Sequence, residues 1–356
     1  MQNVEPLDML RLFLPDQAIS GLVPLGLGNI NETWRVDLAD GSQRVLQRLR
    51  PTVFPDLGVV MDNVRLLTRH LNRARIPGLC FFTLCPLADG RDHVFDQEGH
   101  CWRMLTYIPH TRTLAHLRTT TQAREIGALL GRFHLLTADL DPAGLGDPLP
   151  GFHCTSQYLR RFDAVAGKRG PVSAAEEECL RIIEQERSGA DLLEAGPPGL
   201  SRRIIHGDPK AANFLFAVRE DRAVSLIDFD TVQPGPVLLD LGDCLRSCCN
   251  PVGETPPDPE TIRCDPTLFA ALLQGYGRHG GALLTPDDRA ALVSAAALLC
   301  FELGLRFFAD HLDGDQYFKT TRPGQNLHRA QVQFRLLRSI HEQRDVLARM
   351  VNEALG

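Results

Sequence analysis

The sequence predicts an α+β protein with two lobes, a strand-rich N-terminal lobe (residues 1–108) and a mostly helical C-terminal lobe (residues 109–356). Apolar and polar residues alternate through residues 20–50, which is typical of strands, whereas most segments after residue 110 repeat at helical spacing. A chain of 356 residues is also longer than one hydrophobic core usually serves. The pattern changes at Tyr107–Pro109, so we expect the boundary there.

In the N-terminal lobe, residues 1–17 favour a helix. The stretch LVPLGLGNINETWRVDLADGSQRVLQRL predicts two strands around a glycine-rich turn, and Asp40–Gly41 predicts a hairpin turn into a third. Helical spacing over residues 57–76 stops at Pro77–Gly78. Further strands are expected in FFTLCPL, DHVFDQEGH and CWRMLTYI.

The C-terminal lobe is expected to be helical apart from a pair of strands within residues 203–230. Helical spacing marks residues 121–137, 156–167 and 174–195. The longest apolar run, AALVSAAALLCF at residues 290–301, is too short to span a bilayer and predicts a buried helix.

Composition and charge exclude several classes of protein. A net charge of −6 disfavours a protein that coats nucleic acid or an anionic membrane. The first residues lack the basic segment of a signal peptide, so we expect a cytoplasmic location. Ten cysteines are too sparse for a disulfide scaffold, and the group Cys244, Cys248 and Cys249 lacks zinc-type spacing, which favours buried thiols.

The stretch IIHGDPKAANFLF, at residues 204–216, places polar residues on a short loop between two apolar segments. Asp208 and Asn213 lie on this loop, and Asp228 ends the later apolar strand AVSLIDFD. The three residues form a set suited to phosphoryl transfer. One carboxylate, Asp208, orients and deprotonates an acceptor hydroxyl, while Asn213 and Asp228 supply the hard oxygen ligands that Mg²⁺ requires.

The glycine-rich turn PLGLGNINETW is a candidate phosphate-binding loop. Gly26 and Gly28 would let backbone N–H groups approach phosphate without a Cβ in the way. Such a short match is more often only a turn, but its position at the start of a strand-rich lobe favours the functional interpretation.

The loop HGDPKAAN resembles the H-x-D-x-x-x-x-N loop of the aminoglycoside phosphotransferase and choline kinase family, which has a protein-kinase-like fold. Within that family the chain is most similar to the N-acetylhexosamine 1-kinases. The similar blocks, in order, are GLGNINETW, VLQRLRPTVFPD, LIDFDTVQPGPVLLDLGDCLR, FELGLRFFADHLDGDQYF and QNLHRA. They extend from about Leu25 to Ala330.

The resemblance implies an ATP- and Mg²⁺-dependent kinase that phosphorylates the anomeric hydroxyl of an N-acetylhexosamine. The N-terminal lobe would bind the nucleotide, and the C-terminal lobe would carry catalysis and substrate binding. Asp208 would be the base and would contact the sugar, Asn213 and Asp228 would hold Mg²⁺, and His206 would brace the loop. The remaining roles implied are nucleotide binding by Gly26, Gly28, Asn29, Gln47 or Arg48, Thr106, Tyr107 and Ile108, with adenine received between the lobes at residues 106–108, and substrate binding by Asp230, Thr231, Arg306 and Tyr317.

The chain departs from the pattern of its relatives in one functional position. Protein kinases hold the phosphates with a lysine on the third strand. Here the lysines are Lys168, Lys210 and Lys319, so the N-terminal lobe has none. Strand alternation points only one of Gln47 and Arg48 inward, and we favour Arg48 because of its charge.

Three smaller departures affect the substrate preference. The N-acetylhexosamine 1-kinases favour His where Asn29 stands, Asp where Glu32 stands and an aromatic residue where Ser247 stands. The last of these points to the sugar pocket, and together they leave the preferred sugar open.

Several residues also have purely structural interpretations. Asp240 and Asp243 are expected to cap a helix start rather than bind metal. Arg306 would serve equally as an ion-pair partner of Glu302, four residues earlier on a helix. Tyr317 would fit either a core or a pocket wall.

Alternative functions remain open at this point. One is a kinase of another small alcohol, such as choline, a different sugar or an aminoglycoside. A protein kinase is disfavoured, since only FDTVQPGPV separates Asp228 from the next helix. Another alternative is an inactive nucleotide-binding protein, which the missing lysine suggests and the intact set Asp208, Asn213 and Asp228 opposes.

Overall fold

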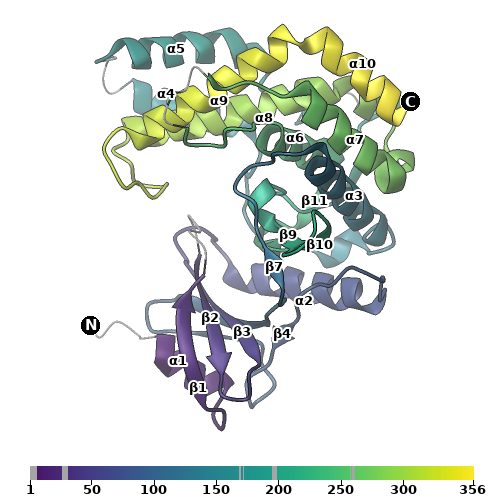
Figure 1. The fold of residues 1–356 in the computed structure, drawn as a ribbon. Helices are drawn as coiled ribbons and strands as arrows, with labels where there is room; N and C mark the ends of the chain where they lie inside the picture. Colours follow the sequence, from purple (N-terminus) through teal and green to yellow (C-terminus); the bar gives the residue numbers. More distant parts are fainter. Residues whose placement is uncertain are drawn as a thin grey trace. The chain divides into compact units, whose positions relative to one another are not determined.

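The structure is a computed structural model that describes residues 6–25, 31–167, 170, 172–194, 199–256, 258 and 261–356. It divides into two compact units. Unit 1 comprises Met1–Thr111, Leu140–Pro150 and Phe229–Gln233, and unit 2 comprises Arg112–Asp139, Gly151–Asp228 and Pro234–Gly356 (Figure 1). The boundary predicted after residue 108 stays a prediction as a division of function.

Unit 1 is built on one antiparallel sheet with the strand order β1–β2–β3–β6–β4, and β5 also pairs with β6. Its helices are α1 (Pro6–Phe13) and α2 (Leu57–Arg73). The strands are β1 (Ile19–Pro24), β2 (Glu32–Leu38), β3 (Gln43–Leu49), β4 (Leu84–Cys85), β5 (His93–Phe95) and β6 (Cys101–Thr106).

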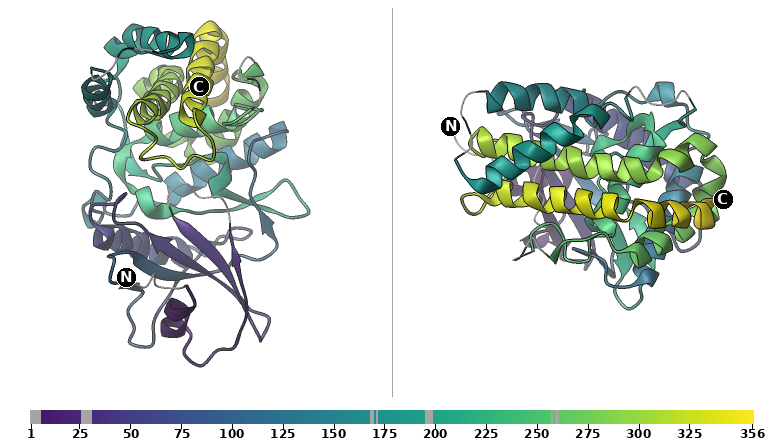
Figure 2. Two further views of the ribbon diagram at one scale, coloured as in Figure 1. Left: turned by 90° about the vertical axis from the view of Figure 1, so that its left-hand side faces the viewer. Right: turned by 90° about the horizontal axis from the view of Figure 1, so that it is seen from above.

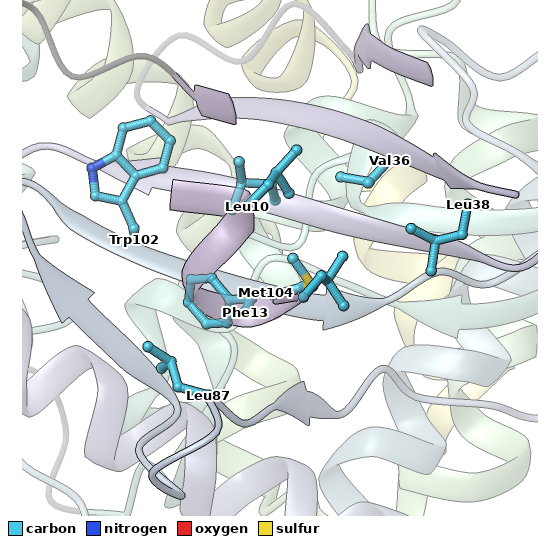
Figure 3. Close-up of a cluster of buried hydrophobic side chains, with 9 residues drawn as sticks. Leu10, Phe13, Val36, Leu38, Leu87, Trp102 and Met104 are labelled. Atoms are coloured by element: carbon cyan, nitrogen blue, oxygen red, sulfur yellow. The ribbon is translucent and has the colours of Figure 1, made fainter. Parts of the chain in front are cut away.

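One face of this sheet packs against α1. Leu10 and Phe13 of the helix meet Val36, Trp102 and Met104 of the strands (Figure 3). These side chains are at most 6% exposed, so the short helix gains its stability from burial rather than from its length.

Helix α2 begins where the sequence supplies a cap. Asp56 accepts hydrogen bonds from the backbone N–H groups of Gly58 (2.9 Å) and Val59 (3.2 Å). The helix ends at Arg73, shortly before Pro77–Gly78, whose glycine has a positive φ of 79°. The predicted helix and its stop signal are confirmed.

Unit 2 is mainly helical, and α8 and α9 lie side by side along it (Figure 2). Its strands form a three-stranded sheet, β10–β9–β7, and a pair, β11–β8. The strands are β7 (Thr111–Arg112, at the boundary of the units), β8 (Arg202–Ile205), β9 (Phe214–Ala217), β10 (Ala223–Leu226) and β11 (Gln233–Pro236). The helices are α3 (Thr120–Leu136), α4 (Thr155–Ala166), α5 (Ala174–Glu186), α6 (Val237–Cys248), α7 (Pro266–Gly280), α8 (Pro286–Leu312), α9 (Gln325–Glu342) and α10 (Arg344–Leu355).

Helices α3 and α7 approach each other through glycines. A Cβ added to Gly127 would lie 1.9 Å from the backbone oxygen of Leu272, and one added to Gly275 would lie 2.0 Å from that of Arg124. Larger residues at these positions would push the backbones apart. The glycines thus set the spacing of two helices that support the candidate site.

Helix α8 contains the apolar run noted in the sequence. By length and composition it could cross a membrane, but 78% of its most apolar 18-residue stretch is buried within the protein. The predicted buried helix is therefore confirmed.

The order of the predicted elements is confirmed. The first helix ends at Phe13 rather than at residue 17, and the sequence did not predict β7 and β11. Both missed strands are short, and β11 contains two prolines and a glycine, which disfavour a strand by sequence. Their pairing partners decide their conformation.

Candidate active site

The loop between β8 and β9 carries Asp208. The Asn213 side chain, at the end of this loop, donates from Nδ2 to the backbone oxygen of Asp208 at 2.8 Å. Gly207, with φ of 86°, allows the turn that presents the aspartate. Asp208 is therefore held at its backbone while its carboxylate, 28% exposed, stays accessible.

The hairpin of β9 and β10 brings Asn213 and Asp228 to the same end. Leu226 pairs with Phe214, and the Ile227 N–H donates to the Asn213 backbone oxygen at 2.9 Å. Asp228 follows directly, with φ of 69°, a conformation that a residue with a Cβ rarely adopts. The sequence-predicted trio is thus assembled by two local connections of the chain.

His206 braces this arrangement. Its Nε2 lies 2.9 Å from the Ile227 backbone oxygen, and its Nδ1 accepts from the Asp208 N–H at 3.2 Å. Both contacts require a neutral ring protonated at Nε2, and burial lowers the pKa of His206 in agreement with that state. The predicted bracing role is confirmed.

Asp240, on α6, is a second support of the loop. Its carboxylate accepts from the backbone N–H groups of His206 (2.7 Å) and Gly207 (2.8 Å), and from His134 Nε2 (2.9 Å). Burial alone would raise the pKa of Asp240, but the hydrogen bond and charge of His134 lower it overall. The interpretation of Asp240 as a helix cap was wrong, because it bonds a loop distant in sequence rather than its own helix.

Asp243 is also not a cap. It lies inside α6 and receives Arg246 Nε at 2.7 Å, while Arg246 reaches Glu254 at 3.0 Å. In the part of the chain that the structure describes, no group of three or more His, Cys, Asp or Glu residues could hold a metal. One turn further along α6, Ser247 Oγ accepts from the Ala211 N–H at 3.2 Å and so supports the loop, while its place near a sugar pocket stays a prediction.

Lys210 is the functional candidate that the sequence analysis missed. Its Nζ lies 2.5 Å from Asp208 Oδ2. Burial alone would lower the pKa of Lys210, but the charges of Asp208 and Asp228 raise it, so the side chain is a cation. Its place two residues after the candidate base Asp208 is the sequence feature that could have indicated this candidate.

Arg306, on α8, lies among aromatic rings. Its guanidinium carbon is 4.9 Å from the ring centre of Tyr158, 5.4 Å from that of Phe152 and 5.5 Å from that of Phe318. Burial alone would lower its pKa, but the Tyr158 and Glu302 side chains raise it, with a contribution from the charge of Asp208. The arginine is therefore a cation enclosed by aromatic rings.

The expected ion pair between Arg306 and Glu302 is not formed. The Glu302 carboxylate instead receives His153 Nδ1 and Thr155 Oγ1, each at 2.8 Å. His153 Nε2 lies 2.7 Å from the Gly207 backbone oxygen, which connects Glu302 to the loop that carries Asp208.

Tyr317 is 44% exposed, so it is not a core residue. Its backbone N–H and that of Phe318 donate to the Asp310 carboxylate at 2.7 and 2.9 Å. The Asn326 side chain donates to the same carboxylate at 2.9 Å, which orders the segment that bears both rings. Substrate binding by Tyr317 and Arg306 stays a prediction.

In unit 1, Gln47 and Arg48 point to opposite faces of β3. Gln47 Oε1 accepts from Arg103 Nε at 2.9 Å, and Arg103 contacts Met61 of α2. Arg48 pairs with Glu32 and lies 5.4 Å from the ring centre of Trp102, on the face that packs against α1. The preference for Arg48 as the inward residue was wrong about orientation, because its strand position places it on the α1 face.

The other residues assigned to nucleotide binding have mixed outcomes. Gly26, Gly28 and Asn29 lie outside the described residues. Thr106 ends β6 and accepts from the Thr83 N–H at 2.9 Å through its hydroxyl, followed by Tyr107 and Ile108. Thr231, assigned to the substrate, is 9% exposed and belongs to the segment of unit 1 that returns late in the chain. Their contacts with ligands stay predictions.

The residues expected to hold Mg²⁺ fit that ion chemically. Asn213 Nδ2 donates to the Asp208 backbone oxygen, which leaves the amide oxygen of Asn213 as the atom that would bind the ion as a hard ligand. Asp228, at the same end of the hairpin, would add a carboxylate oxygen.

Solved structures similar to this chain share its fold. A microcompartment-associated aminopropanol kinase has a TM-score of 0.65 at 18% identity, over 96% of this chain and 98% of that one. An amicoumacin kinase in complex with AMP-PNP, Ca²⁺ and Ami has a TM-score of 0.62 at 13% identity, over 93% of each chain. A choline kinase from Cryptosporidium parvum Iowa II has a TM-score of 0.59 at 14% identity, over 94% and 93%.

These likenesses show a protein-kinase-like fold. The model of the phosphotransferase enzyme family (APH) matches residues 21–293. The chain belongs to this family, as its HGDPKAAN loop suggested.

Proposed function

We propose that the protein is a cytoplasmic kinase that transfers the γ-phosphoryl group of ATP, with Mg²⁺, to the anomeric hydroxyl of an N-acetylhexosamine such as N-acetylglucosamine or N-acetylgalactosamine. The product is the sugar 1-phosphate. The observation that carries the proposal is the assembly of Asp208, Asn213 and Asp228 by the bonds that tie residues 206–213 to residue 227.

Asp208 acts on the acceptor. Its carboxylate accepts a hydrogen bond from the sugar hydroxyl, orients it for in-line attack and takes its proton as the new O–P bond forms and the bond to the leaving ADP breaks. The anomeric hydroxyl is more acidic than other sugar hydroxyls, so a carboxylate suffices as base. Lys210, 2.5 Å from Asp208, is the cation next to the reacting atoms and reduces the repulsion between that carboxylate and the incoming phosphates.

Asn213 and Asp228 would hold the divalent cation through their oxygen atoms. A cation bound there would supply positive charge that offsets the negative charge of the nucleotide phosphates. The chain's own contribution is to fix the Asn213 amide through its bond to Asp208, and to hold the backbone before Asp228 through the bond of Ile227 to Asn213.

Arg306 supports a neutral acceptor. If Arg306 lines the acceptor site, as proposed, the positive charge of its guanidinium disfavours a cationic substrate such as choline or an aminoglycoside. The same group donates hydrogen bonds that suit the hydroxyl and amide oxygens of an N-acetylated sugar. The resemblance to N-acetylhexosamine 1-kinases points to the same acceptor.

Phosphorus NMR of the purified protein tests the proposal. The protein is incubated with Mg-ATP and, separately, with N-acetylhexosamines, simple hexoses, choline and aminoglycosides. We expect a new anomeric phosphate signal with an N-acetylhexosamine. Turnover only with another acceptor would reject the sugar assignment but keep the role of Asp208, and turnover with none would favour an inactive nucleotide-binding protein.

A further inference from the structure

Unit 1 contains a buried arginine on a strand where it lies between the apolar residues Trp102 and Met104. Arg103 of β6 is 1% exposed, and a guanidinium is costly to bury unless it is paired. Its Nη1 lies 2.7 Å from Asp230 Oδ1, and Asp230 is itself 3% exposed. Its Nε donates to Gln47 Oε1 at 2.9 Å. Arg103 is thus a fixed cation in a lobe that has no lysine.

Asp230 is held from a second direction. Asn31 Nδ2 donates to Asp230 Oδ2 at 2.7 Å. Asn31 directly follows the glycine-rich segment in the sequence, whereas Arg103 lies on β6. One carboxylate from late in the chain therefore joins two early parts of unit 1.

The neighbours of Asp230 are fixed as well. Phe229 stacks on Phe82 with ring centres 5.3 Å apart, and Asn63 of α2 donates to the Val232 backbone oxygen at 2.9 Å. Residues 229–232 are consequently clamped to unit 1 by an ion pair, an aromatic contact and a backbone hydrogen bond.

This clamp begins one residue after Asp228. The residue before Asp228, Ile227, is tied by hydrogen bonds to Asn213 and His206. Asp228, with φ of 69°, lies between the two tied segments, and such a conformation persists only where the surroundings fix it.

We propose that Arg103 is a positioning residue for the metal ligand Asp228. Its ion pair with Asp230 holds the backbone after Asp228, and so keeps the Asp228 carboxylate in the conformation that binds the divalent cation of the nucleotide. This inference rests on the proposed function, because it takes Asp228 as a metal ligand. Arg103 itself touches neither metal nor substrate in this role.

The test measures nucleotide binding rather than turnover. Isothermal titration calorimetry gives the Kd of ATP with Mg²⁺ and with EDTA, and the ratio of the two is the gain due to metal. We expect Arg103→Met and Asp230→Asn each to reduce this gain about tenfold or more, while the Kd in EDTA changes by less than about threefold. Arg103→Lys should recover part of the gain, because a lysine restores the charge but not the bond to Gln47.

Arg65→Met is the matched control. It breaks an arginine–aspartate pair of the same unit, with Asp92 at 2.5 Å, that does not include residues 228–232. It should leave the gain unchanged. If Arg103→Met does not fold, Asp230→Asn decides the test, since it removes the charge but keeps an acceptor for Asn31.

Two results would overturn the inference in distinguishable ways. A normal gain in both Arg103→Met and Asp230→Asn would reject the positioning role alone and leave a structural ion pair. No gain in the unaltered protein would reject the metal role of the site, and this inference with it.

Discussion

Asp208 combines an accessible carboxylate with a backbone fixed by Asn213 and His206. Replacement by asparagine keeps the shape but removes the proton acceptor, so Asp208→Asn should lower kcat by about 10²- to 10⁴-fold. The Kd of Mg-ATP should change little. Rapid-quench kinetics and calorimetry measure the two quantities. The exposed Asp163→Asn is a control with normal kcat, and an active Asp208→Asn enzyme would remove Asp208 from the base role.

His153 gives a prediction for pH dependence. Burial alone would lower its pKa, but the charge and hydrogen bond of Glu302 raise it overall. A folded-state pKa above the unfolded value of about 6.5 means that protonation stabilises the fold fully below that pH. This stabilisation is lost as pH rises through the folded-state pKa.

The free energy of unfolding of the unaltered protein should therefore exceed that of His153→Gln by more at pH 6 than at pH 9. Urea denaturation at the two pH values measures this difference. The Glu302 carboxylate does not change its charge between pH 6 and pH 9, because its pKa is lowered below the usual value for glutamate. A difference independent of pH would show that His153 is neutral when folded.

At the scale of elements, the spacing of α3 and α7 supports the loop that carries Asp208. His134 of α3 bonds Asp240 at 2.9 Å, and Tyr276 of α7 bonds His134 at 2.9 Å. Asp240 in turn holds the backbone of His206 and Gly207. A chain of buried hydrogen bonds thus links the positions of the two helices to the position of the loop.

Gly127→Ala should separate these helices, because its Cβ would meet the Leu272 backbone oxygen at 1.9 Å. We expect a loss of about 1–3 kcal/mol in the free energy of unfolding and a fall in kcat. Gly281→Ala is the control, since among the described residues no atom lies within 4 Å of its added Cβ. Equal stability of the two variants, measured by urea denaturation, would contradict the close-packing argument.

At the scale of the whole molecule, binding of Mg-ATP should stabilise the fold by mass action. At a concentration 100 times Kd the gain is about 2.7 kcal/mol. Asp228→Ala should remove most of the part that depends on Mg²⁺, because it deletes one of the two expected protein ligands. Thermal unfolding with ATP and either Mg²⁺ or EDTA measures this, and an unchanged Mg²⁺ effect in the variant would exclude Asp228 as a ligand.

The sequence by itself determined the order of most strands and helices and the core of the candidate site. Strand and helix periods are local properties, so residues 57–76 and 290–301 are recognisable without their partners. Asp208 and Asn213 are near each other along one loop, and Asp228 reaches them through a single hairpin. Short connections leave few alternative arrangements, and for this reason the trio could be predicted.

Only the tertiary structure decided which distant residues support that trio. Asp240 reaches His206 from another helix, and Arg103 reaches Asp230 from 127 positions earlier in the sequence. Likewise, strand alternation showed that Gln47 and Arg48 lie on opposite faces of β3. Only the packing of α1 and α2 on the sheet decided that Arg48 lies on the α1 face and Gln47 on the other. A buried charge is stable only beside a partner of opposite charge. When folding brings that partner from a distant part of the chain, the local sequence around the charge does not identify it.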